Sequence, residues 1–162
     1  SSVQKYNTKI LVETGTFLGD MVDALKDAFD EIYSIEISDQ LYKQAVTRFE
    51  NIGHINLLHG DSGKEIKNVL KTIKTPALFW LDGHYSGGVT GKGEKDTPIL
   101  EELGHIFSMA KHNHVIIIDD ARCFGSDPAY PSIDELKQFV SSKRDDLQIH
   151  VEDDSIRITP DK

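Results

Sequence analysis

Short apolar runs alternate with segments of helical period along most of this chain. Strands this uniformly apolar are typical of a parallel sheet that helices cover on both faces. The intervening segments repeat apolar residues with the i, i+3, i+4, i+7 spacing of amphipathic helices. The pattern predicts an α/β fold with a doubly wound sheet. The apolar runs are Ile10–Glu13, Ile32–Glu36, Ile55–His59, Ala77–Asp82 and Val115–Asp119.

Local motifs predict two helix starts and a closing hairpin. Ser62-Gly-Lys-Glu65 and Ser132-Ile-Asp-Glu135 both have the capping-box pattern, in which a serine N-cap is paired with a glutamate three residues later. After the last predicted helix, Leu147–Val151 and Ile156–Thr159 flank Glu152-Asp-Asp-Ser155. Two strand-like runs around so short a polar segment are typical of an antiparallel hairpin.

Composition narrows the class of protein. A length of 162 residues without internal repeat or linker suits one domain, so we expect residues 1–162 to form a single unit. The net charge of −9, from 27 acidic against 18 basic residues, argues against nucleic acid and against anionic membrane surfaces as partners. Cys123 is the only cysteine, which favours a reducing, cytoplasmic compartment. No apolar run approaches the roughly 20 residues of a membrane span.

The loop after the first apolar run has the features of a ligand-binding turn. It reads Glu13-Thr-Gly-Thr-Phe-Leu-Gly19. Gly15 allows the backbone to turn sharply and to approach a ligand, and Gly19 allows the following helix to start close to the first strand. Glu36 ends the second run, where an acid can accept both hydroxyls of a ribose; a solvated strand-end acid is the alternative. Together they predict a site for a nucleoside-bearing cofactor.

The same loop does not fit a dinucleotide. The G-x-G-x-x-G pattern, started at Gly15, requires glycine at positions occupied by Phe17 and Asp20. Its E-x-G-x-x-x-G pattern, with the β-α units and the closing hairpin, instead resembles the class I S-adenosylmethionine-dependent methyltransferases over nearly the whole chain. The resemblance implies their Rossmann-like fold: a seven-stranded, mostly parallel sheet whose antiparallel seventh strand lies between the fifth and sixth.

The resemblance also implies a set of S-adenosylmethionine-binding residues at the ends of the first four strands. Glu36 would bind the ribose and Asp61 the adenine amino group, while Ser62 also fits the N-cap role in its capping box. The implied set is Glu13, Thr14, Gly15, Gly19, Glu36, Ile37, Asp61, Ser62 and Asp82.

Three acids end the fourth and fifth runs. Asp82, Asp119 and Asp120 are expected to converge because these strands are neighbours in a doubly wound sheet. Hard carboxylate ligands suit Mg²⁺, Mn²⁺ or Ca²⁺. The triplet resembles the metal site of cation-dependent O-methyltransferases of the catechol and macrocin types, in which the metal binds the acceptor hydroxyl and lowers its pKa. Two alternatives remain. Asp82 occupies a position that is commonly acidic or polar in metal-free members of the family too, and Asp120 could cap a turn.

The loop after the fourth run supplies the remaining catalytic candidates. His84 follows Asp82 closely and could act as a general base beside it, although a loop histidine can equally be an ordinary polar contact. Residues 83–96 contain five glycines, which suits a lid over the substrate or a plain surface connection.

These observations predict an S-adenosylmethionine-dependent methyltransferase that modifies an oxygen of a small polar acceptor with help from a divalent metal. The chain is close to a minimal core, so a second subunit in a homodimer could complete the acceptor pocket. Two alternatives remain open: a non-catalytic module that binds S-adenosylmethionine or S-adenosylhomocysteine, and a different nucleotide-using enzyme with a doubly wound sheet.

Overall fold

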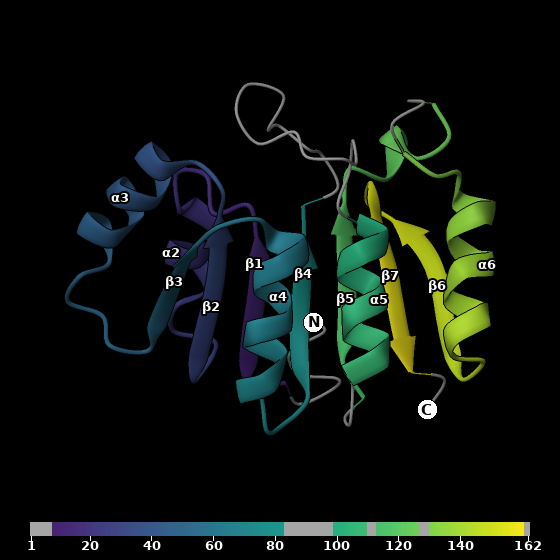
Figure 1. The fold of residues 1–162 in the computed structure, drawn as a ribbon, viewed down its shortest axis with the longest axis horizontal. Coiled ribbons are helices and arrows are strands. Elements are labelled where there is room, and N and C mark those ends of the chain that lie inside the picture. The colour runs from purple at the N-terminus through teal and green to yellow at the C-terminus, as the bar shows by residue number, and fades with distance from the viewer. Residues whose placement is uncertain (1–7, 83–98, 110–112, 127–129, 161–162) are drawn as a thin grey trace.

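The computed structural model describes residues 8–82, 99–109, 113–126 and 130–160, and these form one seven-stranded sheet (Figure 1). The strand order is β3-β2-β1-β4-β5-β7-β6. β1 to β5 are parallel, and β7 runs antiparallel to both of its neighbours, β5 and β6. The strands are β1 (Ile10–Thr14), β2 (Glu31–Glu36), β3 (Ile55–His59), β4 (Ala77–Leu81), β5 (Val115–Asp119), β6 (Leu147–Glu152) and β7 (Ser155–Pro160).

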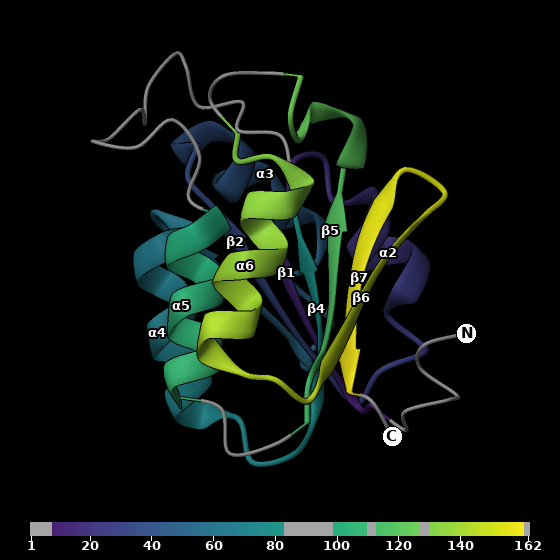
Figure 2. The same cartoon turned by 90° about the vertical axis from the view of Figure 1, so that its right-hand side faces the viewer.

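Helices cover both faces of the sheet, as the apolar runs predict. In Figure 2, α4, α5 and α6 lie on one face and α2 lies on the other. α3 packs with α2, because Ala45 of α3 and Val22 of α2 belong to the same apolar cluster. The helices are α2 (Asp20–Leu25), α3 (Asp39–Arg48), α4 (Ser62–Thr72), α5 (Ile99–Met109) and α6 (Ile133–Lys143), with a 3₁₀ turn, η2 (Ala121–Cys123), after β5.

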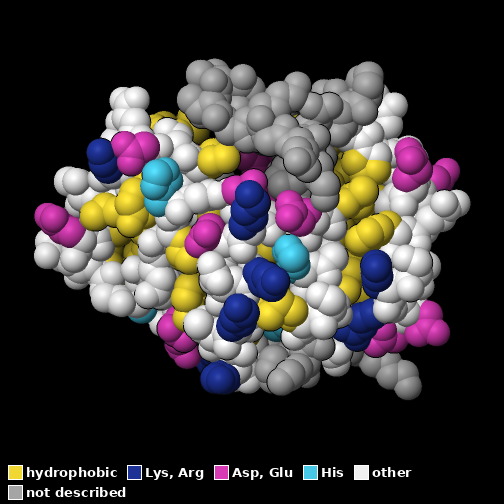
Figure 3. Space-filling view, viewed as in Figure 1, with side chains coloured by type: hydrophobic (Ala, Val, Ile, Leu, Met, Phe, Trp, Pro, Cys, Tyr) yellow, Lys and Arg dark blue, Asp and Glu magenta, His cyan; other side chains and the backbone are white. Residues whose placement is uncertain are grey.

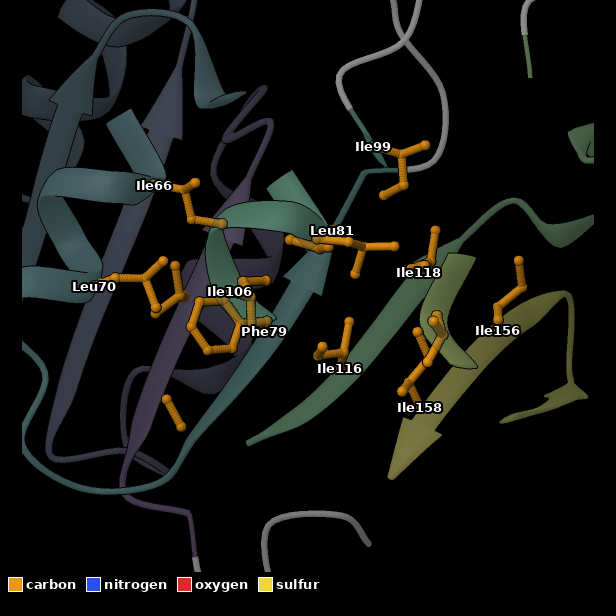
Figure 4. Packing of buried hydrophobic residues seen from close by; sticks show 14 of the residues in the cluster. Ile66, Leu70, Phe79, Leu81, Ile99, Ile106, Ile116, Ile118, Ile156 and Ile158 are labelled. Atoms are coloured by element: carbon orange, nitrogen blue, oxygen red, sulfur yellow. The ribbon is translucent and has the colours of Figure 1, made fainter. Parts of the chain in front are cut away.

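Each central strand sends alternate side chains into two separate cores. Phe79 and Ile116 pack beneath α4, α5 and α6, in the larger cluster (Figure 4). Their strand neighbours Leu78 and Ile117 belong to the smaller cluster, beneath α2 and α3. Since side chains alternate with a period of two along a strand, burial on both faces requires apolar residues at nearly every position. This explains why the central strands are recognisable as continuous apolar runs.

The structure confirms the predicted fold, including the antiparallel strand inserted near one edge of the sheet. Asp153 and Asp154 form the turn between β6 and β7, and both have positive φ (53° and 58°), as in the type I′ turns that suit hairpins. The fourth strand ends at Leu81, one residue before the predicted Asp82. None of the helices in the described ranges is long and apolar enough to cross a membrane.

One of the two capping boxes is confirmed and the other is wrong. Ser132 caps α6, and its hydroxyl and the Glu135 carboxylate exchange hydrogen bonds with each other's backbone amides. At α4 the N-cap is Asp61, whose Oδ1 accepts from the Gly63 amide at 2.8 Å. A carboxylate one residue earlier satisfies the helix N-terminus, so the Ser62 side chain is free to turn elsewhere.

Candidate functional site

The turn between β1 and α2 places its backbone against an acidic side chain. Gly15 has φ +80°, and a Cβ at this position would lie only 2.7 Å from Asp82 Oδ2. The Gly15 amide donates to the Ile35 carbonyl at 2.8 Å, which fixes the turn to β2. The amide of Asp82 donates to Thr14 Oγ1 at 2.8 Å. Thr14, Gly15 and Asp82, three of the residues predicted for the cofactor, are therefore in direct contact.

Glu36 holds the same turn from the other side. Its Oε1 accepts from the Phe17 amide at 2.8 Å, and its Oε2 accepts from the Ser38 amide at 2.9 Å. These bonds fix the carboxylate in place, and the residue is only 6% exposed. A carboxylate has about four acceptor positions, so roughly half remain for other donors such as ribose hydroxyls.

Glu13 lies deeper, at the end of β1, and is 3% exposed. Its Oε1 accepts from Ser34 Oγ at 2.6 Å, and Ser34 Oγ is in turn 2.6 Å from Thr16 Oγ1. Burial raises the pKa of Glu13 to about 7, and the nearby Asp82 and Glu36 charges add to the rise, against the lowering effect of the Ser34 hydrogen bond. This carboxyl group is therefore close to half-ionised at neutral pH.

A second buried acid lies where α4 begins. Glu102 of α5 is 1% exposed and accepts a short hydrogen bond from Ser62 Oγ through its Oε2. Its Oε1 is buried without a hydrogen-bond partner in the described structure. Burial raises the pKa of Glu102 to about 8, and the charges of Asp82, Asp61 and Glu101 raise it further. Glu102 is therefore mostly neutral at pH 7.

The acids that end β5 are bound into a different network. Asp119 Oδ1 accepts from the Asp120 amide at 2.9 Å, and burial raises the pKa of Asp119. Asp120, with φ 59°, accepts from Arg122 Nη1 at 2.9 Å. Arg122 also donates to Asp154 in the β6–β7 turn. Asp120 thus helps to fasten the end of β5 to the hairpin through Arg122.

Among the residues that the structure describes, the three acids predicted to bind a metal do not form a recognisable metal centre. Leu81 pairs with Ile118, so Asp82, just after β4, and Asp119, the last residue of β5, lie at neighbouring strand ends as predicted. The Asp82 carboxylate, however, lies against Gly15, while Asp120 is paired with Arg122. Within the described ranges, no group of three or more His, Cys, Asp or Glu side chains could hold a metal ion. The metal site therefore stays a prediction.

The other predicted residues are divided between described and undescribed parts of the chain. Gly19, with φ +89°, begins α2, and a Cβ there would lie 2.8 Å from the Phe49 ring. The Ile37 carbonyl accepts from the His59 ring at 3.2 Å and lies beside the end of β3. His84 and the predicted lid at residues 83–96 lie outside the described residues.

Two residues of the site were not predicted from the sequence. Ser34 is a polar residue inside an otherwise apolar β2, and Glu102 lies among the buried positions of α5, with Leu103 and Ile106. A polar residue at a position that the helical or strand period assigns to the core is the available signal, because burial requires such a group to have a partner.

No protein-family model and no curated protein matches this chain, whereas many solved structures do. A Podospora anserina methyltransferase bound to S-adenosylhomocysteine has a TM-score of 0.65 at 15% identity, over 98% of this chain and 74% of that one. A Streptococcus mutans protein assigned as a methyltransferase, also in complex with S-adenosylhomocysteine, has a TM-score of 0.64 at 12% identity, over 94% and 89%. A Staphylococcus aureus protein assigned as a caffeoyl-CoA O-methyltransferase has a TM-score of 0.63 at 15% identity, over 98% and 78%. The chain therefore has the fold of S-adenosylmethionine-dependent methyltransferases.

Proposed function

We propose that this chain, which has the methyltransferase fold, transfers a methyl group from S-adenosylmethionine to a small polar acceptor. The observation that carries the proposal is the meeting of Glu13, Glu36 and Asp82 around the Gly15 turn, at the carboxyl edge of the sheet. In doubly wound sheets this edge is where ligands bind.

Each part of this edge suits one part of the cofactor. The spare acceptor capacity of Glu36 suits the ribose hydroxyls, and Asp61, next to the start of α4, suits the adenine amino group. Asp82 and Glu13 create a negative potential around Gly15, which favours the cationic amino acid part of the molecule. Bound S-adenosylmethionine supplies an electrophilic methyl group. The contribution of the protein is to orient the cofactor and acceptor in line and to exclude water.

The acceptor that we propose is a small molecule and not a nucleic acid. The chain carries a net charge of −9, which opposes contact with phosphate backbones. On the face shown in Figure 3, basic side chains lie in a row over α4, with acidic side chains beside the upper part of the row. The acidic side chains weaken the attraction of this row for phosphate groups. We further propose an oxygen as the methylated atom, with His84 as its general base. The proposal includes no metal step, because the described residues contain no group of three or more His, Cys, Asp or Glu that could hold a metal ion.

Calorimetric titration with S-adenosylhomocysteine, with Mg²⁺ and with EDTA, tests the proposal. We expect binding in both conditions, with the same affinity. Glu36→Gln should weaken binding at least about tenfold, since a charge-assisted hydrogen bond is worth roughly 1.5–3 kcal/mol. Glu31→Gln is the matched control, because Glu31 lies at the opposite end of β2 and is exposed.

Transfer of a labelled methyl group to a panel of hydroxylated small molecules then separates an enzyme from a binding module. Absence of S-adenosylhomocysteine binding in both conditions would overturn the proposal. Binding without transfer to any acceptor would identify the chain as a non-catalytic cofactor-binding module.

A further inference from the structure

The buried acids at the carboxyl edge have neutral hydrogen-bond donors. Glu13 accepts from the Ser34 hydroxyl, and Glu36 accepts from two backbone amides. Within the described ranges, no ion pair involves either of these glutamates. Their negative charge is therefore stabilised by dipoles and not by a cation of the protein.

The charged groups around Glu13 increase this imbalance. Asp82, after β4, and Glu36, on β2, both act on Glu13 as like charges. α2 packs over the same face of the sheet and carries Asp20 and Asp23. The basic groups near α2 are engaged with those two acids: Arg48 with both of them, and Lys26 with Asp23. Arg48 and Lys26 therefore do not neutralise Glu13, and another cation has to relieve the repulsion there.

A pair of hydroxyls connects Glu13 to the turn that faces the ligand. Thr16 belongs to this turn and its Oγ1 lies 2.6 Å from Ser34 Oγ, which lies 2.6 Å from Glu13 Oε1. When Glu13 is ionised, Ser34 must donate to it and Thr16 must donate to Ser34. When Glu13 is protonated, both hydroxyls can reverse, because a hydroxyl both donates and accepts. The ionisation state of Glu13 thus sets the direction of hydrogen bonding at the turn.

We propose that binding of S-adenosylmethionine at this site drives the release of a proton from Glu13 to solvent, so that cofactor affinity is controlled by pH. This inference rests on the proposed function. The sulfonium and ammonium groups of the cofactor bring positive charge to a cluster of carboxylates, and an opposite charge at short range favours the ionised form of an acid. By linkage, a ligand that favours the ionised form binds more tightly where that form is already populated.

The sign and size of the effect follow from the free protein. Since the pKa of Glu13 is about 7 before binding, the group is mostly neutral below that pH and mostly ionised above it. Binding at about pH 6 must therefore include deprotonation, whereas binding at about pH 8 need not. If the cofactor requires ionised Glu13, the dissociation constant should be about tenfold higher at pH 6 than at pH 8.

The test is calorimetric titration of wild type and Glu13→Gln with S-adenosylmethionine at pH 6, 7 and 8, in pairs of buffers with different ionisation enthalpies. Glutamine keeps the shape and the Ser34 hydrogen bond but holds the site neutral. Titration of the cofactor itself contributes equally to both proteins, so their difference isolates Glu13. Wild type should show the tenfold change relative to the variant and should release about half a proton more at pH 7. Glu31→Gln should behave as wild type.

Equal pH dependence and equal proton release in wild type and Glu13→Gln would overturn the inference and leave the proposed function intact. Failure of wild type to bind at every pH would overturn the proposed function itself. Should Glu13→Gln not fold, the Glu13 carboxyl can be titrated in the wild type by ¹³C NMR, with and without S-adenosylmethionine. A lower pKa in the complex supports proton release, and an unchanged one refutes it.

Discussion

Glu102→Gln should make this protein more stable at neutral and alkaline pH. The Glu102 carboxyl is buried between α5 and the start of α4, and its pKa rises from 4.5 to about 8 on folding. Between these values the unfolded chain binds fewer protons than the native one, so the free energy of unfolding falls as pH rises. At about 1.4 kcal/mol per pKa unit, the full loss is on the order of 5 kcal/mol, of which about 3 kcal/mol is reached by pH 7.

Glutamine removes this loss because it does not ionise. Its amide oxygen can still accept from Ser62, and its NH₂ group takes the position of Oε1, which has no partner in the described structure. That unpartnered position is present in the protonated wild type as well, so its cost largely cancels. The stability advantage of the variant should therefore widen by on the order of 3 kcal/mol between about pH 5 and about pH 8.

Urea denaturation at several pH values, followed by the fluorescence of Trp80, measures this difference. Trp80 is the only tryptophan. The other titrating acids, Glu13 and Asp119 among them, are the same in both proteins and cancel in the comparison. Glu50→Gln is the control, because Glu50 is exposed and is not among the charges that act on Glu102. A difference in unfolding free energy that stays constant from pH 5 to pH 8 would refute the assignment of a neutral Glu102.

Two further substitutions test the turn and the core. Gly15→Ala should lower the unfolding free energy by about 1–3 kcal/mol and abolish S-adenosylhomocysteine binding, because φ is +80° and the new Cβ would lie 2.7 Å from Asp82 Oδ2. Gly53→Ala, where a Cβ meets nothing within 4 Å, is its control in thermal denaturation and calorimetry, and equal behaviour of the two variants would contradict the proposed close approach. Leu103→Ala should cost about 2–5 kcal/mol in urea denaturation, since Leu103 is a fully buried residue of α5, whereas the exposed Val151→Ala should cost less than about 0.5 kcal/mol. A loss below about 1 kcal/mol at Leu103 would show that the site collapses or is not packed as described.

The strands could be predicted from sequence because burial on two faces leaves a strong local signal. β3 and β5 begin and end where the apolar runs do. The first helix is harder to bound: apolar residues at helical spacing continue in the sequence from Leu18 to Phe29, but α2 covers only Asp20–Leu25. Helical period alone does not show where a stripe continues through a turn, and Phe29 is buried without belonging to the helix.

The sequence predicted where the backbone of the candidate site lies in the fold, but not the directions in which its side chains point. The spacing of glycines and acids placed Gly15 and Glu36 at one edge of the sheet. Where a carboxylate points depends on distant partners: Arg122, which binds Asp120, is held by Asp154, 32 residues further along the chain. Similarly, the Ser62 hydroxyl reaches Glu102 across 40 residues, which no local motif indicates. Such partners are fixed by tertiary packing, so a motif read alone misassigned the role of Ser62.

The insertion of β7 between β5 and β6 affects the order in which the molecule can be assembled. β5 is made before β6, yet its sheet partner on that side is β7, with Ile116 paired to Ile158. Until β7 arrives, the backbone groups along that side of β5 have no sheet partner, and an open strand edge of this kind invites pairing with other chains. We therefore expect the β6–β7 hairpin to form first as a local unit and then to dock on β5 in a late, non-local step. The Asp154 carbonyl, which accepts from the Ala121 amide, would then tie the turn of the docked hairpin to the exit of β5, so completion of the sheet also completes the rim beside the proposed catalytic edge.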